Sequence, residues 1–358
     1  MERKRSTYME WAKLSSSARF NLATSGLTNV MLAEFSLRPA ELEITGGGYG
    51  YLPLLERISR LTGAPVDCVV SAEGTSMANH LAAAALLEPG DEVVIEKPAY
   101  GLLLDLLHYL GARVRRIERR FEDNFAISLG EMEKVITPAT RLIVLTNLHN
   151  PSGAFLSVET LQSIGDLAAR AGALVLVDEV YLPMLFDSAP STAFSLGQNF
   201  VVTTSLTKTY GLSGLRCGWI LAAPELAQRM WRLNDLFAAT AAHPAERMSV
   251  MAFDHLEQFR QRARDLLTAN RALLDAFLDS RDDLECFRPL AGSVVFPRLP
   301  RGEPEAFFQL LREKYETSVV PGRFFEMPRH FRLGIGGETA TLQGGLERLG
   351  AALDEFLA

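Results

Sequence analysis

The sequence of 358 residues has few cysteines and no long apolar run. Its three cysteines, Cys68, Cys217 and Cys286, share no close spacing, so we expect neither a disulfide framework nor a bound metal. Such sparse cysteine usage is typical of a reducing compartment, and we predict a cytoplasmic protein. The first residues are charged and then polar, without the apolar core of a signal peptide. The leucine-rich run 102–107 is interrupted by Asp105 and is too short to span a membrane, so we predict no membrane partner.

An excess of positive charge is also missing. The sequence has 36 lysines and arginines against 43 aspartates and glutamates, which gives a net charge of -7 at pH 7. A general nucleic-acid-binding protein would normally carry a basic excess or a basic patch, so we predict no nucleic-acid partner. Hydrophobic residues make up 48% of the chain, which is ordinary for a globular protein, and the length suffices for two domains.

Segments that favour helices alternate with short apolar segments that favour strands through the first two thirds of the chain. The expected strands are 92–95, 112–117, 141–146, 174–177, 200–204 and 217–221. The expected helices are 54–61, 76–87, 101–110, 129–135 and 158–170. Strands that are apolar on both faces and alternate with helices are typical of a mostly parallel sheet covered by helices, so we predict the α/β class.

The pattern changes after about residue 240. A long charged helix is expected over 245–278, followed by the strands 293–296 and 331–335 and by the helices 305–315 and 342–356. We therefore predict three parts. An N-terminal segment, 1–45, packs with the small domain; 46–240 form a large domain that binds the cofactor introduced below; and 241–358 form a small α+β domain.

Polar residues follow three of the expected strands. Asn150 follows the first of them, Asp178 and Tyr181 follow the next, and Lys208 follows the third. Ligands of such sheets bind at the carboxyl ends of the strands, so we expect these side chains to converge. Each residue alone also has an ordinary interpretation: a turn for Asn150, a helix cap for Asp178, and a surface lysine for Lys208.

The stretch 205–216 carries the most specific chemistry. Lys208 lies among small and polar residues, and partial burial near other cations would lower its pKa and favour a reactive amine. Ser205 and Arg216 bracket it with a hydroxyl and a rigid guanidinium, a combination that suits a phosphate.

Three motifs in this order resemble the class I/II aminotransferases, which are fold type I enzymes dependent on pyridoxal 5′-phosphate. They are 150–153 (Asn-Pro-Ser-Gly), Asp178-x-x-Tyr181, and Ser205-x-x-Lys208 with Arg216 eight positions after the lysine. The resemblance extends from about residue 21 to residue 332. It implies a large domain with a seven-stranded sheet between helices, and a homodimer with its active sites at the subunit interface.

The resemblance assigns roles that make chemical sense. Lys208 would hold the cofactor as an internal aldimine and, once freed, would move the Cα proton of the substrate. Asp178 would pair with the pyridine nitrogen and keep it protonated, so that the ring can act as an electron sink. Tyr181 and Asn150 would hydrogen-bond the phenolate oxygen of the ring.

The phosphate of the cofactor would be held by Ser205, Arg216 and the start of the helix after Glu73. Gly74 permits close approach there, Thr75 offers a hydroxyl, and backbone N–H groups at a helix N-terminus bind phosphate well. By itself this segment is an ordinary capped helix start. A carboxylate beside a phosphate would be repulsive, so we expect Glu73 to point away.

Three further residues take roles from the resemblance. Tyr100 would stack on the cofactor ring. Arg332, on an apolar strand, would bind the substrate α-carboxylate with help from Asn150 and from the backbone of Gly26. Without the resemblance, Tyr100 is an ordinary core tyrosine and Arg332 a structural ion pair.

One position departs from the family pattern. Relatives often place a tyrosine five positions before the glycine that opens the first helix, where it reaches the phosphate of the neighbouring subunit. If Gly50 is that glycine, Thr45 occupies the position, and Tyr49 or Tyr51 could substitute, so this contact stays unassigned.

We therefore predict an aminotransferase that moves an amino group from an amino acid to a 2-oxo acid through pyridoxamine phosphate. The main alternative is another reaction of the same cofactor: a β-lyase, cyclase, decarboxylase or racemase. A non-catalytic sensor or a protein with a decayed site is a weaker alternative. Only about twenty residues precede Asn21, too few for a DNA-binding domain. No second arginine can be placed against a side-chain carboxylate, so an aromatic or aliphatic amino donor is favoured.

Overall fold

The structure is a computed structural model that describes residues 4–34, 42, 44 and 48–358. Thr45 and Gly46, which flank the expected boundary between the N-terminal segment and the large domain, lie outside the described residues.

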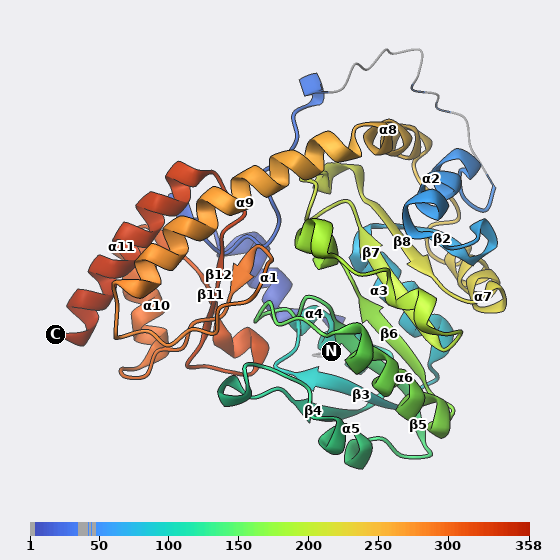
Figure 1. Cartoon of the computed structure of the whole chain (residues 1–358), viewed down its shortest axis with the longest axis horizontal. Helices are drawn as coiled ribbons and strands as arrows, with labels where there is room; N and C mark the ends of the chain where they lie inside the picture. Colours follow the sequence, from blue (N-terminus) through green and yellow to red (C-terminus); the bar gives the residue numbers. More distant parts are fainter. Residues whose placement is uncertain (1–3, 35–41, 43, 45–47) are drawn as a thin grey trace.

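A seven-stranded sheet forms the centre of the larger part of the molecule (Figure 1). Its strand order is β2-β8-β7-β6-β5-β3-β4. Strand β8 is antiparallel to both of its neighbours, and the remaining neighbours are parallel, so the sheet is mostly parallel, as predicted. The strands are β2 (Val69–Glu73), β3 (Glu92–Lys97), β4 (Arg113–Glu118), β5 (Thr140–Thr146), β6 (Leu174–Asp178), β7 (Phe200–Ser205) and β8 (Cys217–Leu221).

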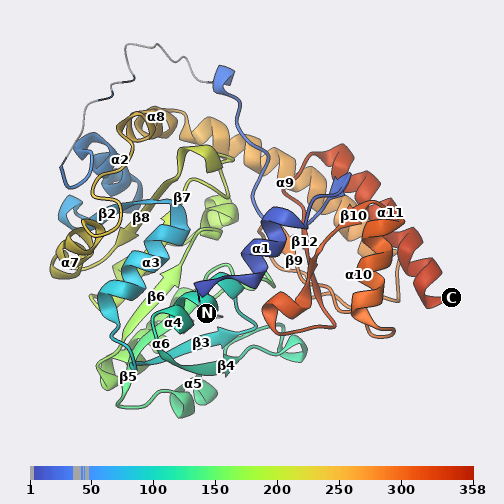
Figure 2. The same ribbon diagram turned by 180° about the vertical axis from the view of Figure 1, so that it is seen from behind.

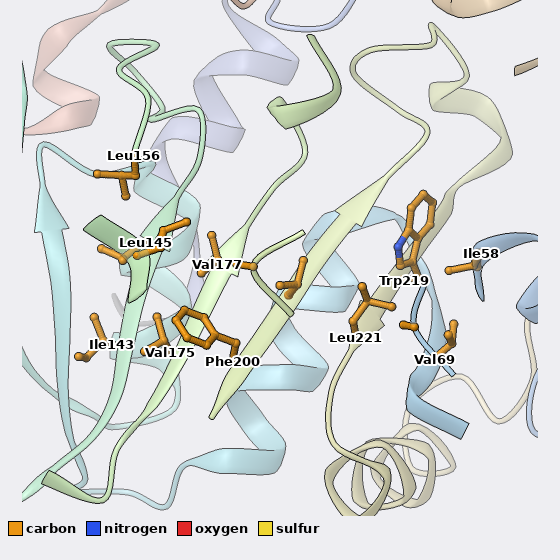
Figure 3. Close-up of a cluster of buried hydrophobic side chains, with 14 of the residues drawn as sticks. Ile58, Val69, Ile143, Leu145, Leu156, Val175, Val177, Phe200, Trp219 and Leu221 are labelled. Atoms are coloured by element: carbon orange, nitrogen blue, oxygen red, sulfur yellow. The ribbon is translucent and has the colours of Figure 1, made fainter. Parts of the chain in front are cut away.

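Helices cover both faces of this sheet, and the alternation of side chains along each strand supplies both cores. In β6, Val175 and Val177 belong to one core, and Leu176 belongs to the other. Helices α2, α5, α6 and α8 contribute to the first core, part of which is drawn in Figure 3, and α3, α4 and α7 contribute to the second. These helices are α2 (Leu52–Thr62), α3 (Gly74–Leu86), α4 (Gly101–Tyr109), α5 (Leu129–Val135), α6 (Val158–Ala171), α7 (Pro224–Asn234) and α8 (His243–Asp254).

The C-terminal part has its own core around a small antiparallel sheet of order β11-β12-β9. Long helices surround this sheet, and a short N-terminal strand, β1, pairs in parallel with β10 beside them (Figures 1 and 2). The elements are β1 (Phe20–Asn21), β9 (Val294–Val295), β10 (Thr317–Ser318), β11 (Val320–Pro321), β12 (Phe331–Gly334), α9 (Leu256–Asp279), α10 (Pro304–Glu313) and α11 (Thr339–Leu357). No described helix combines the length and the hydropathy that crossing a membrane requires.

The structure corrects the prediction of one helix over 245–278. The chain forms two helices there, because His255 has φ -107° and ψ 9°, which is outside the α-helical region, and α8 therefore ends before α9 begins. Strand β2 and helix α7 were not predicted from the sequence.

A third unpredicted element is α1 (Thr7–Leu14) near the N-terminus. It begins where the Ser6 hydroxyl accepts a hydrogen bond from the backbone N–H of Met9, an N-cap. In Figures 1 and 2 the helix lies between the large sheet with its helices and the C-terminal part. It packs against α4 on one side, and on the other Tyr8 and Trp11 contact Phe324 of the short 3-10 helix η9 (Gly322–Phe325).

Candidate active site

A cavity of about 610 Å³ lies at the carboxyl ends of the parallel strands, under α1. Three of the predicted residues, Ser205, Gly74 and Arg332, do not line it but contact residues that do. The other predicted residues line it together: Gly26, Thr75, Tyr100, Asn150, Asp178, Tyr181, Lys208 and Arg216.

Lys208 lies three residues beyond the end of β7, with its Nζ atom 3.0 Å from the Ser25 hydroxyl oxygen. Burial lowers the pKa of this amine, and the neighbouring Tyr8 hydroxyl opposes that shift. Gly26 packs closely on the lysine: a Cβ atom at Gly26 would lie 3.5 Å from Lys208 Cδ. The amine is therefore enclosed, and its neutral, nucleophilic form is favoured.

Asp178 is the last residue of β6 and is 4% exposed. Its carboxylate accepts hydrogen bonds from Asn79 Nδ2 at 2.9 Å and from the Val180 N–H at 3.1 Å, and Asn79 Oδ1 accepts from the Thr203 hydroxyl at 2.5 Å. Burial raises the pKa of Asp178 to about 6. It forms no ion pair among the described residues, although the charge of Lys208 lowers its pKa, so the carboxylate is available to a cationic group of a ligand.

Three hydroxyl groups cluster where β7 meets the start of α3. The Thr75 hydroxyl donates to Ser205 Oγ at 2.7 Å, and Ser205 Oγ lies 2.7 Å from Thr207 Oγ1. Thr207 lines the cavity beside Lys208, although the sequence analysis did not single it out. These groups and the free N–H groups of the first turn of α3 suit the oxygens of a phosphate.

The Arg216 guanidinium packs against Gly74 at the same place. Gly74 has φ +75°, and a Cβ atom on it would lie 2.4 Å from Arg216 Nη2, so only glycine fits without displacing the guanidinium. Arg216 Nη2 donates to the Glu73 carbonyl oxygen at 3.2 Å, and the Glu73 residue is exposed. The basic cradle thus depends on a glycine, and the residues present fit a phosphate group.

Arg332 is 1% exposed, yet it has no acidic partner among the described residues. Nη1 donates to Asn150 Oδ1 at 3.0 Å, and Nη2 donates to the Tyr8 hydroxyl at 3.0 Å and to the Ala23 carbonyl at 3.2 Å. Its Nε atom has no partner in the described structure. A buried guanidinium with only neutral partners favours an anionic ligand, and a carboxylate matches its geometry.

Two tyrosines complete the walls of the cavity. Tyr181 is 3% exposed, and burial raises its pKa. Burial also raises the pKa of Tyr100, whose ring stands edge-on to the Tyr8 ring at 5.5 Å between centroids. Both hydroxyls therefore stay protonated at neutral pH and can donate hydrogen bonds.

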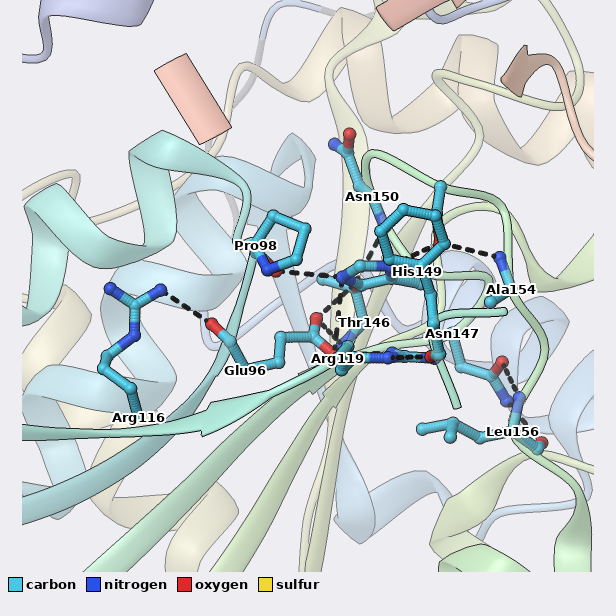
Figure 4. A network of polar contacts seen from close by, with 12 residues as sticks. Glu96, Pro98, Arg116, Arg119, Thr146, Asn147, His149, Asn150, Ala154 and Leu156 are labelled. Atoms are coloured by element: carbon cyan, nitrogen blue, oxygen red, sulfur yellow. Dashed lines mark hydrogen bonds and ion pairs between the residues drawn. The ribbon is translucent and has the colours of Figure 1, made fainter. Parts of the chain in front are cut away.

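A buried polar network supports Asn150 from below (Figure 4). The Asn150 N–H donates to Thr146 Oγ1 at 3.0 Å, and the Thr146 hydroxyl donates to Glu96 Oε1 at 2.5 Å. Glu96 Oε2 accepts from Arg119 Nη1 at 2.7 Å, and both of these charged side chains are almost completely buried. Burial holds the pKa of His149 well below its usual range, so its ring is a neutral part of this network.

Four residues of the cavity and its surroundings escaped the sequence analysis: Tyr8, Ser25, Asn79 and Thr207. Asn79 could have been found, because it is a polar residue one turn after Thr75 in an alanine-rich helix. Ser25 directly precedes the singled-out Gly26. Tyr8 had no such signal, because its helix was not expected.

Comparison with known proteins gives a consistent result. A family model described as "Aminotransferase class I and II" matches residues 13–349. The capreomycidine synthase of Streptomyces vinaceus is 30% identical over 302 residues, which cover 84% of this chain and 77% of that protein. The arginine–pyruvate transaminase of Pseudomonas aeruginosa is 28% identical over 320 residues, 85% of this chain and 80% of its own. The crystal structure of a PLP-dependent aminotransferase from Streptococcus suis superimposes with a TM-score of 0.93, at 27% identity and 99% coverage of both chains.

Proposed function

This chain belongs to the aminotransferases of class I and II, and we propose that the cavity under α1 is its active site. It is an enzyme that moves an amino group from an amino acid to a 2-oxo acid with pyridoxal 5′-phosphate as its cofactor. One observation carries the assignment of the site. A single cavity brings together a half-buried amine, a buried carboxylate that forms no ion pair among the described residues, and a cradle of hydroxyl groups and a guanidinium. Behind the wall of this cavity lies the buried Arg332, which has no anionic partner within the part of the chain that the structure describes.

Each of these groups fits one part of the cofactor. We propose that Lys208 attaches it covalently and that Asp178 pairs with its ring nitrogen. Tyr181 and Asn150 donate hydrogen bonds to the ring oxygen, and Tyr100 lies against the ring. Four side chains and the glycine that leaves room for one of them hold the phosphate: Gly74, Thr75, Ser205, Thr207 and Arg216.

When bound, the cofactor withdraws electrons from the substrate and so makes its Cα proton acidic. The chain's own groups then have distinct tasks. Once its amine is free, Lys208, whose pKa is lowered by burial, would act as the base that takes the Cα proton of the substrate. Asp178 remains ionised beside the protonated ring nitrogen, because a cation next to it favours the carboxylate form. Asp178 is buried and Lys208 is half-buried, so both groups are partly shielded from water.

We propose that Arg332 binds the α-carboxylate of the substrate, with Asn150 and the backbone of Gly26 beside it. The unsatisfied charge of its buried guanidinium supports this role. The cavity wall on the α1 side contains Met9, Trp11, Ala12 and the cationic Lys13, and no acidic side chain of α1 lines it within the described residues. A donor with an aromatic or aliphatic side chain is therefore favoured over one with a cationic side chain.

A single-turnover assay tests these assignments. The cofactor-loaded enzyme is mixed with L- and D-amino acids, one at a time, while the cofactor absorbance is followed and the released 2-oxo acid is measured. Lys208→Ala should abolish turnover, and the exposed control Lys134→Ala should not. Turnover that survives in Lys208→Ala would refute the assigned mechanism.

A second candidate function is another reaction of the same cofactor, such as cyclisation or elimination. One relative, the capreomycidine synthase at 30% identity, is a synthase by name rather than a transaminase, which favours keeping this candidate. In the same assay, a product formed without amino transfer to the cofactor would support it.

We also propose a homodimer with its active sites at the subunit interface. Around the end of α7, Tyr49, Leu236 and Phe237 are exposed at 47%, 79% and 53%, and such an apolar patch suits a second copy of the chain. Light scattering should give twice the chain mass, and Phe237→Asp should reduce it. A wild-type protein that stays monomeric would contradict the dimer.

Three further assignments are proposals as well. The core of the large sheet includes Phe259, whereas Ala263 belongs to the C-terminal core, so we propose that the two domains meet within α9 rather than at residue 240. The N-terminal segment packs beside the smaller domain through β1. The three unpaired cysteines support a cytoplasmic location.

A further inference from the structure

Helix α1 brings an aromatic side chain into the cavity from the very start of the chain. Tyr8 is 7% exposed, and its ring is fixed by three others: Tyr100 at 5.5 Å, Phe324 at 5.8 Å and Phe325 at 5.9 Å between centroids. The first of these comes from the large sheet's side and the other two from η9. The position of the Tyr8 hydroxyl is therefore set by packing against both parts of the molecule.

The hydroxyl of Tyr8 is engaged on one side only. Its oxygen accepts a hydrogen bond from Arg332 Nη2 at 3.0 Å, and its hydrogen has no acceptor among the described residues. The guanidinium of Arg332 also lies 5.7 Å from the centre of the Tyr8 ring. A phenol that accepts from a cation and has a free O–H is a ready donor to an anion bound by the same cation.

We propose that Tyr8 is a substrate-binding residue whose hydroxyl donates a hydrogen bond to the carboxylate held by Arg332. This inference rests on the proposed function and deepens it, because it adds a third contact to the carboxylate site. Asn150 and Tyr8 then flank the two terminal nitrogens of Arg332, one on each side. In this proposal the N-terminal helix α1 takes part in substrate binding and is not only a structural element.

The geometry also predicts what Tyr8 does not do. Its hydroxyl forms no hydrogen bond, within the described structure, with Thr75, Ser205, Thr207 or Arg216, which form the phosphate cradle. Removing its hydroxyl should therefore weaken the binding of carboxylates and leave cofactor affinity unchanged. This separation distinguishes a substrate contact from a general structural role.

The test compares the cofactor-loaded wild type with Tyr8→Phe, which keeps the ring and its packing. The probes are 3-phenylpropionate, a carboxylate without an amino group, and phenethylamine, the matching amine without a carboxylate. Their dissociation constants are measured by titration while the cofactor absorbance or the heat of binding is followed. Tyr109→Phe, which removes a hydroxyl from a half-exposed tyrosine, is the matched control.

We expect Tyr8→Phe to weaken 3-phenylpropionate binding by about tenfold or more, as is typical of a lost hydrogen bond to a charged group. The dissociation constants of phenethylamine and of the cofactor should stay within about twofold of the wild type. The melting midpoint should stay within about one degree. KM for the amino donor should rise by the same factor as the dissociation constant of the acid.

Two outcomes would overturn the role of Tyr8. The first is an unchanged dissociation constant for 3-phenylpropionate in Tyr8→Phe. The second is an equal loss for the acid and the amine, which would indicate a structural effect. A different result would contradict the proposed function itself. In that case the wild type would transaminate none of the amino acids tested, independently of the effect of Tyr8→Phe on carboxylate binding.

Discussion

Replacing Glu96 with glutamine should destabilise the protein far more than an ordinary surface substitution. Glu96 Oε2 accepts from Arg119 Nη1 at 2.7 Å, and the two side chains are 1% and 0% exposed. Burial raises the pKa of Glu96 and lowers the pKa of Arg119, in each case against the pull of the partner. Each charge is thus tolerated only because the other is present.

Glutamine would replace the carboxylate of Glu96 with a neutral amide. The Arg119 guanidinium would then be buried without a counter-charge. Breaking a buried pair in this way costs about 3–5 kcal/mol. For a chain of 358 residues this corresponds to a fall of about 4–7 °C in the melting midpoint. The matched control is Glu118→Gln, because Glu118 pairs with Lys97 at the neighbouring strand end, at 3.0 Å but with side chains 52% and 35% exposed. An exposed pair contributes less than about 1 kcal/mol.

Differential scanning calorimetry of both variants measures the two midpoints. A double variant, Glu96→Gln with Arg119→Met, removes the stranded charge and should recover most of the loss. The reasoning is refuted if Glu96→Gln shifts the midpoint no more than Glu118→Gln does. It is also refuted if the double variant melts well below the single variant. The unpaired guanidinium would then not be the cause of the lost stability.

Two further predictions concern the cofactor cradle and pH. Gly74→Ala should weaken cofactor binding, because the added Cβ would displace the Arg216 guanidinium. The loss of one charge-assisted hydrogen bond from Arg216 to the phosphate corresponds to about tenfold or more. Gly63→Ala is the control: its φ is +74° but nothing lies within 4 Å of the added atom, so equal losses in cofactor titrations would contradict the prediction. Burial raises the pKa of Glu179 to about 7 from an ordinary value of 4.5, so the folded state holds a proton that the unfolded state has lost between these values. Its contribution makes stability fall by about 3 kcal/mol as the pH rises from 4.5 to 7 and stay level above 7. Glu179→Gln lacks this contribution, so melting midpoints that run parallel to the wild type across this range would refute it.

Much of the fold could be predicted because its signals are local. The bounds of the apolar strands β3 to β8 and of the helices between them were predicted to within two residues, since each is a short run bounded by turn formers. Strand β2 was not predicted because its apolar run is short. It ends in Ala72 and Glu73, directly before the start of helix α3. The break at His255 was missed because helix-favouring residues lie on both sides of it.

The chemistry of the site could be predicted from the sequence, because Asn150, Asp178 and Lys208 follow consecutive parallel strands. The carboxyl ends of such strands lie at the same edge of the sheet wherever the sheet forms. Only the tertiary structure decided which groups are charged, free or shielded there. Burial shifts the pKa values of Asp178 and Lys208 away from the ordinary values of their residue types. Contacts between segments more than 300 positions apart, such as Tyr8 with Arg332, depend on the packing of the whole chain, and no local pattern encodes them.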